Sequence, residues 1–148
     1  MGTFDRLAVG ERVAAPAGVI PADARAVARD IGGYTHPLFT DDQWVRDHSP
    51  FSTGPVPGEF VLFLLGGLAE RSSAFDDTTI ALVGLDEVRF LSPAFPGDAI
   101  ALQMEVVDKQ RFGSGRRGSM RMRWTCAKPD GSEVLSAIAT FLFDLSGP

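Results

Sequence analysis

The stretch GEFVLFLLGGLAE, residues 58–70, decides the fold. Apolar side chains occupy nearly every side of a helix drawn on these residues, which predicts a helix buried in a core. Gly66 and Gly67 inside it each cost about 1 kcal/mol relative to alanine, and we expect them to permit close packing against a sheet. The segment therefore predicts one central helix that needs a sheet to cover it.

The residues after the helix supply that sheet. β-rich or alternating patterns favour strands at Thr79–Val83, Leu85–Leu91, Ala99–Arg111, Arg117–Lys128 and Glu133–Leu145. The clearest alternation puts Met120, Met122, Trp124 and Cys126 on one face. Asp130-Gly131 is a hairpin turn sequence and indicates antiparallel pairing. Together these patterns predict an α+β fold, with an antiparallel sheet of about five strands curled around one long helix.

The part of the chain before the helix gives weaker signals. We expect residues 1–18 to form an irregular lead-in, followed by a short helix over Ala24–Asp30. Thr40 and Gln43 have the spacing of a capping box, which predicts a second short helix with Asp41 and Asp42 at its start. A length of 148 residues fits a single domain, 1–148.

Composition excludes several classes of function. A net charge of −5 and a pI near 4.9 argue against nucleic-acid binding. Cys126 is the single cysteine, so neither an internal disulfide nor a cysteine metal site is expected. No third ligand lies near Asp41 and Asp42 in the sequence, and we predict no metal. The longest apolar run, 60–68, is too short to span a membrane. Residues 1–13 do not resemble a signal peptide, so we expect a cytoplasmic protein.

Three segments carry a family resemblance. IGGYTHPLFTD (31–41), SPFSTGPVPG (49–58) and VRFLSPAFPGD (88–98) resemble, in order, motifs of the MaoC-like acyl-thioester hydratases and dehydratases. The resemblance implies a hotdog fold with an acyl thioester held in a tunnel at the subunit interface. Because a lone curled sheet leaves edges that must be covered, we expect a homodimer built through the sheet edge or the helix face. The thioester would be one of coenzyme A or of an acyl carrier protein, and no other cofactor is implied.

The motif departs from the family at its catalytic positions. With Pro37 and Asp41 as anchors, Tyr34 occupies the usual aspartate position, His36 the asparagine position and Phe39 the histidine position. Phenylalanine carries no exchangeable proton, and tyrosine with a pKa near 10 is a poor base. We therefore predict that ordinary hydration of crotonyl-CoA is slow or absent.

The resemblance also implies where the substrate binds. Backbone N–H groups at the helix start, Pro57-Gly58, would polarise the thioester carbonyl, as free N–H groups at helix N-termini can. Glycine at position 58 would allow close approach of a ligand, or it only permits the turn into the helix. We expect the substrate-binding residues to be Phe39, Pro57, Gly58 and Phe60.

Three residues are candidates to replace the missing catalytic pair. His36 has the right chemistry near neutral pH, but it could instead brace the loop. Glu59 could act as a base if a substrate tunnel partly buried it, or it could merely complement the helix dipole. Tyr34 could donate a hydrogen bond to the substrate, or it could form an aromatic lid.

The resemblance implies an enzyme that hydrates or dehydrates an acyl or polyketide-type thioester at its α,β-carbons, here with non-standard acid–base residues. The alternatives are a hotdog cyclase, isomerase or thioesterase that uses the same pocket, and a catalytically silent subunit or ligand-binding protein. A basic stretch of strand residues, 111–123, is either a solvated face or a patch for coenzyme A phosphates or an acidic carrier protein.

Overall fold

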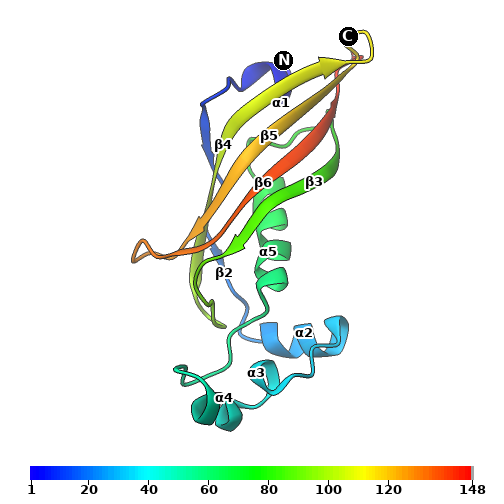
Figure 1. Ribbon diagram of the computed structural model, residues 1–148. Coiled ribbons are helices and arrows are strands. Elements are labelled where there is room, and N and C mark those ends of the chain that lie inside the picture. The colour runs from blue at the N-terminus through cyan, green and yellow to red at the C-terminus, as the bar shows by residue number, and fades with distance from the viewer. Residues whose placement is uncertain (148) are drawn as a thin grey trace.

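A computed structural model describes residues 1–147, and Figure 1 shows an antiparallel sheet curled around one long helix. The helices are α1 (Thr3–Arg6), α2 (Ala24–Gly32), α3 (Pro37–Thr40), α4 (Asp42–His48) and α5 (Gly58–Glu70). The strands are β1 (Arg12–Ala14), β2 (Gly18–Val19), β3 (Thr79–Phe90), β4 (Ala99–Phe112), β5 (Arg117–Ala127) and β6 (Glu133–Asp144). Their order is β1-β4-β5-β6-β3, with β2 also paired to β4. Helices α2 to α4 lie beyond one end of the sheet (Figure 1).

Helix α5 has the predicted bounds, but only one side of it is buried. Val61, Leu65 and Leu68 are at most 3% exposed, whereas Phe63 is 76% exposed. A single curled sheet covers one side of a helix, so the opposite apolar side stays open. The expectation of a fully buried helix is therefore wrong for this outer side.

Strand β5 confirms the predicted alternation. Met120, Met122, Trp124 and Cys126 are at most 1% exposed, and β5 is paired on both sides, with β4 and β6. Burial raises the pKa of the Cys126 thiol to about 11. The predicted hairpin is also present, because Gly131 has φ +86° and its N–H donates to the Lys128 carbonyl at 2.9 Å.

The N-terminal lead-in is not irregular as expected. It contains α1 and two short strands that pair with β4, with Val13 opposite Met104 and Gly18 opposite Ile100. The free edge of β4 offers unpaired backbone groups, which these segments satisfy. The sheet consequently has six strands, rather than about five.

Two other predicted boundaries are corrected. Residues 79–90 form one strand through Gly84, with an irregular register between Leu82 and Gly84, where we predicted two strands. Helix α4 is capped by Asp41, whose carboxylate accepts from the N–H groups of Gln43 and Trp44 at 3.0 and 3.2 Å. The Thr40 hydroxyl instead donates to the His36 carbonyl. A carboxylate can satisfy two free N–H groups of the first turn, which explains the shift by one residue.

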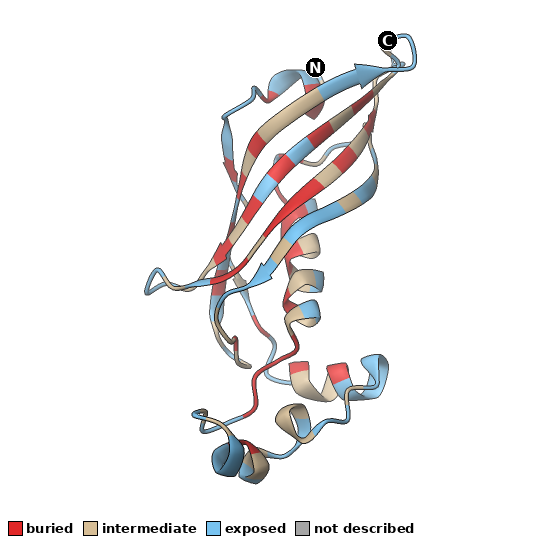
Figure 2. Ribbon diagram, in the orientation of Figure 1, coloured by how far each residue is buried: buried red, intermediate tan, exposed pale blue. Residues whose placement is uncertain are grey.

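Strand β3 is the exposed edge of the sheet, and none of its twelve residues is buried (Figure 2). Its apolar side chains continue the open side of α5. We call the set formed by Phe63, Ile80, Leu82, Val83, Leu85 and Phe90 the apolar edge; each is between 36% and 76% exposed. Across residues 1–147, no helix is both long and apolar enough to cross a membrane.

Candidate functional site

The site begins at the N-terminus of α5. Pro57 is buried and precedes the helix, and its carbonyl accepts from the N–H groups of Phe60 and Val61 at 3.0 and 3.3 Å. The N–H groups of Gly58 and Glu59 therefore have no partner inside the helix. A Cβ at Gly58 would lie 2.4 Å from the ring of Phe90. A side chain at position 58 would therefore require the half-exposed ring of Phe90 to move, whether or not a ligand also approaches.

A hydrogen bond joins two of the predicted catalytic residues. The Tyr34 hydroxyl donates to Glu59 Oε2 at 2.8 Å. This bond favours the protonated phenol and raises the pKa of Tyr34 above its usual value. Glu59 is exposed in the single chain, so the partial burial considered for it would have to come from a ligand or a second chain.

Aromatic rings connect Tyr34 to the rest of the motif loop. The ring of Phe39 packs edge-on against Tyr34 at 5.5 Å and against His36 at 6.5 Å between centroids. His36 also meets Trp44 edge-on at 5.2 Å. The ring of Phe39 therefore lies between those of Tyr34 and His36.

His36 has a structural task in this arrangement. Its Nδ1 accepts the Leu38 N–H at 3.0 Å, which caps the N-terminus of α3. The side chain is exposed and borders none of the hollows described below. The geometry therefore places Glu59 and Tyr34 together and leaves His36 apart from them.

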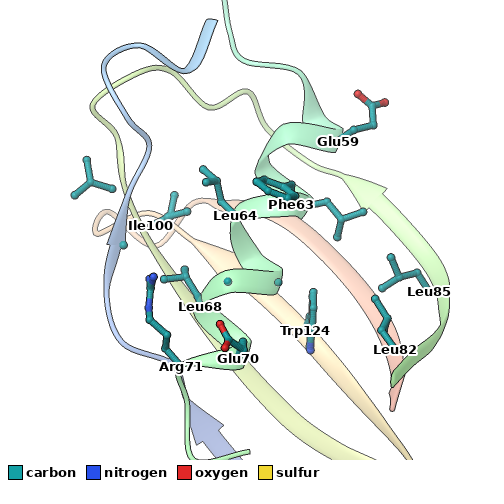
Figure 3. A pocket seen from close by; sticks show the side chains of 15 residues that line it. Glu59, Phe63, Leu64, Leu68, Glu70, Arg71, Leu82, Leu85, Ile100 and Trp124 are labelled. Carbon is teal, nitrogen blue, oxygen red and sulfur yellow. The ribbon is translucent and has the colours of Figure 1, made fainter. Parts of the chain in front are cut away.

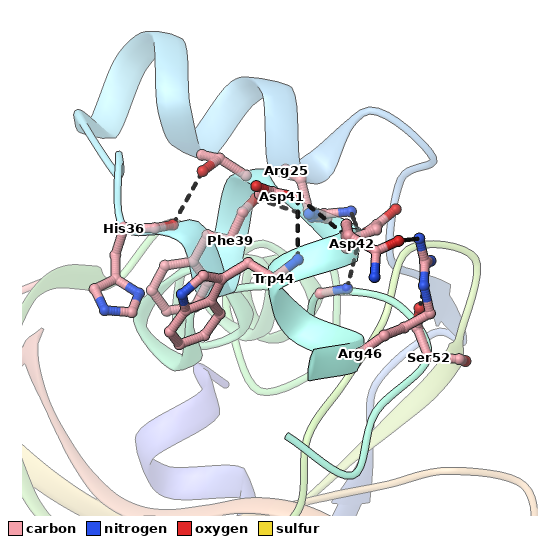
Figure 4. A network of polar contacts seen from close by, with 11 residues as sticks. Arg25, His36, Phe39, Asp41, Asp42, Trp44, Arg46 and Ser52 are labelled. Carbon is pink, nitrogen blue, oxygen red and sulfur yellow. Dashed lines mark hydrogen bonds and ion pairs between the residues drawn. The ribbon is translucent and has the colours of Figure 1, made fainter. Parts of the chain in front are cut away.

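A polar network fixes the motif loop (Figure 4). Arg25 donates from Nε to the Phe39 carbonyl at 2.9 Å and pairs with Asp42 at 2.8 Å. Asp42 also accepts the Gly54 N–H at 3.0 Å. The pKa of Asp42 is lowered, first by the Gly54 N–H and then by Arg25. The network thus ties the loop both to α2 and to the segment that enters α5.

Glu59 borders two hollows. The larger, which we call the α5–β3 groove, has a volume of about 720 Å³ and runs from Glu59 to Glu70 and Arg71 at the opposite end of α5 (Figure 3). Its walls between these ends are mostly apolar. The smaller, the Phe90 pocket, measures about 320 Å³ and includes Gly58, Glu59 and Phe90. A volume of this range suits a small-molecule site.

The other predicted substrate-binding residues lie nearby but outside the hollows. Pro57 is buried, and Phe60 is partly buried, packs against the core and meets Phe63 with ring centroids 6.4 Å apart. Sequence reasoning missed Phe90, and it predicted Trp124 only as an inward strand residue. The VRF sequence at residues 88–90 gives no local signal that Phe90 would reach the helix start.

Comparison with known proteins gives a partial relative in sequence. No protein-family model matches the chain. The 3-hydroxyacyl-[acyl-carrier-protein] dehydratase FabZ of Haemophilus influenzae is 29% identical over 90 residues, which are 49% of this chain and 61% of that relative. The match thus covers less than two thirds of the relative's length.

Solved structures match over nearly the whole chain. A monoamine oxidase regulatory protein from Archaeoglobus superposes with a TM-score of 0.85 and 26% identity, covering 97% of this chain and 95% of its own. The MaoC-like dehydratase from Rhodospirillum rubrum superposes with a TM-score of 0.84 and 21% identity, and the match covers 98% of both chains. A double-hotdog protein from Mycobacterium tuberculosis superposes with a TM-score of 0.81 and 21% identity, and the match covers 97% of this chain and 44% of that one.

A curled antiparallel sheet around one central helix, shared with these structures, makes this chain a hotdog-fold protein. The match to the Rhodospirillum protein extends over nearly the full length of both chains and shows the same fold. In its fold the chain resembles the MaoC-like hotdog proteins.

Proposed function

We propose that the protein is an enzyme that adds water to, or removes it from, the α,β-carbons of an acyl thioester, using Glu59 and Tyr34 in place of the usual pair. The observation that carries the proposal is the 2.8 Å hydrogen bond between these residues, at the N-terminus of α5 and beside the α5–β3 groove. The dehydratase name of the partial sequence relative supports the reaction class.

The chemistry follows from the pair. In dehydration, the Glu59 carboxylate takes the proton from C2 of a 3-hydroxyacyl thioester, and that electron pair forms the C2–C3 double bond. The hydroxyl leaves C3 as water with a proton from Tyr34. The free N–H groups of the first turn of α5 stabilise the charge on the thioester oxygen. The proton on Glu59 then returns to Tyr34 through their hydrogen bond, and both residues are restored.

The proposal includes a homodimer and a thioester carrier. Pairing of β3 with a second copy would cover the apolar edge and enclose Glu59. The acyl group, including one of polyketide type, would be bound to coenzyme A or an acyl carrier protein. Arg121 and Arg123 are exposed on β5 and could meet either carrier. A cytoplasmic location belongs to the same proposal, and cell fractionation tests it.

A thioesterase is the second candidate, because an exposed carboxylate on the central helix could activate water against the thioester carbonyl. The two reactions differ in product. Hydrolysis releases free coenzyme A thiol, whereas hydration retains the thioester. A thiol assay run beside mass analysis of the acyl-CoA therefore separates them.

The test uses the purified full chain with trans-2-octenoyl-CoA. We expect 3-hydroxyoctanoyl-CoA to form, with the rate on crotonyl-CoA slower by about 10²–10⁴-fold than that of an enzyme with positioned Asp and His. Glu59→Gln and Tyr34→Phe should each lose most activity while melting like the parent.

His36→Ala distinguishes between Glu59 and His36 as the base. Normal turnover by His36→Ala would mean that Glu59 and Tyr34 transfer the protons. If His36→Ala is inactive while Glu59→Gln remains active, His36 is the base. Full activity in all three variants, or no turnover by the parent, contradicts the proposal.

A further inference from the structure

One buried polar group inside the fold has no use in the reaction proposed above. Trp124 is 1% exposed, and its Nε1–H has no hydrogen-bond partner among residues 1–147. It is the sole buried side-chain nitrogen or oxygen in that part of the chain without a partner. Buried donors are nearly always paired, because an unpaired one keeps its full desolvation cost. A phenylalanine would fill much of the same space without that cost.

Trp124 lies at the wall of the α5–β3 groove. It also borders a neighbouring hollow of about 320 Å³ that shares Gly66 and Leu82 with the groove. A Cβ at Gly66 or Gly67 would meet no atom within 4 Å, so these glycines face open space. The close helix–sheet packing that we expected from them is therefore not their role. Both glycines instead line the α5–β3 groove, as Trp124 does, and Gly66 and Trp124 also line the neighbouring hollow.

The position of Gly66 along α5 sets its distance from Glu59, where the proposed reaction takes place. Gly66 is seven residues after Glu59 on α5, which corresponds to a rise of about 10 Å. Figure 3 shows the indole nitrogen at the end of the ring farther from Glu59. An acyl chain with its thioester at Glu59 would lie along the apolar wall and bring its tail toward Trp124.

We infer that this acyl tail bears a keto or hydroxyl oxygen that accepts the Trp124 Nε1 hydrogen bond. The inference rests on the proposed function, because that function sets which end of the groove holds the thioester. A plain alkyl tail would leave the buried donor unpaired, whereas an oxygenated tail would satisfy it. Sites built around a buried hydrogen-bonding group discriminate strongly against analogues that lack the matching group. The enzyme would therefore prefer medium-length chains with an oxygen near the far end.

Calorimetric binding of two matched compounds tests the preference. We expect 7-oxo-octanoyl-CoA to bind the full chain about tenfold more tightly than octanoyl-CoA, as one added hydrogen bond would give. In Trp124→Phe the two affinities should become equal. Trp44→Phe, which alters an aromatic residue on α4 that borders no described hollow, should keep the tenfold difference.

A spectroscopic readout remains informative if Trp124→Phe does not fold. The chain has two tryptophans, so ¹⁵N-labelled protein gives two indole N–H signals, and Trp44→Phe assigns them. The Trp124 signal should move downfield with 7-oxo-octanoyl-CoA and much less with octanoyl-CoA. If the two compounds bind with equal affinity and shift the Trp124 signal equally, the inference about the acyl tail is overturned but the proposed function is not. Failure of both compounds to bind overturns the proposed function as well.

Discussion

Strands β5 and β3 have similar lengths and apolar contents but opposite surroundings. β5 is paired on both sides and buries every second residue, whereas β3 is paired only with β6 and buries none. The same contrast divides α5, where Leu65 is inaccessible and Phe63 is 76% exposed. One half of the protein is a well-packed hydrophobic core. The other half presents apolar surface beside the candidate site, and this location indicates that the apolar edge serves binding or assembly.

The largest expected effect distinguishes the two sides of α5. Leu65→Ala should lower the free energy of unfolding by about 2–5 kcal/mol, because it leaves a cavity in the core. Phe63→Ala removes a side chain that is 76% exposed within one chain, so at concentrations low enough to keep the protein monomeric it should cost far less. Urea unfolding of both variants at one protein concentration measures the difference. Similar losses would mean that Phe63 is as well packed as Leu65.

A charge on the apolar edge should weaken assembly. Phe63→Glu forfeits roughly 1.5–3 kcal/mol of side-chain burial per chain, so the dissociation constant of the dimer should rise at least about tenfold. Ile31→Glu is the matched control, since Ile31 on α2 is 83% exposed and lies outside the apolar edge. Sedimentation across a concentration series reports both. Equal weakening by the two variants would contradict the role given to the edge.

Substitution of Gly58 should have an effect of intermediate size on stability. Gly58→Ala brings a methyl group against Phe90 and should destabilise the fold by about 1–2 kcal/mol through overpacking. Adding Phe90→Ala should recover much of that loss, which a double-mutant cycle of melting experiments measures. If the second change recovers nothing, the glycine is needed for another reason, such as ligand access.

The smallest effect concerns the loop between α5 and β3. Although burial works against it, hydrogen bonds from Thr78 and Thr3 lower the pKa of Asp76 from 3.8 to about 2. Its stabilisation is therefore present above pH 4 and is lost as the pH falls through about 2. Because the group is mostly exposed, Asp76→Asn should cost less than about 1 kcal/mol at pH 7. Unfolding experiments should show the two proteins converging near pH 2, and a constant gap would exclude this cause.

The sequence predicted the parts that depend on local patterns. The bounds of α5, the alternation of β5 and the Asp130-Gly131 turn each follow from neighbouring residues. The pairing of β1 and β2 with β4 joins segments that are far apart in the chain, so no local pattern reveals it. The Tyr34–Glu59 bond likewise spans 25 positions. The exposure of β3 was missed because an apolar strand appears the same in sequence whether a core or a second chain covers it.

The mass of the protein in solution tests most directly whether the apolar edge is an interface. Light scattering at micromolar concentration should give twice the 15.9 kDa of one chain. Phe63→Glu at the same concentration should move that mass toward a single chain, and Ile31→Glu should leave it unchanged. A parent protein that is monomeric under these conditions would contradict the account, because β3 and the outer side of α5 would then be exposed without a partner.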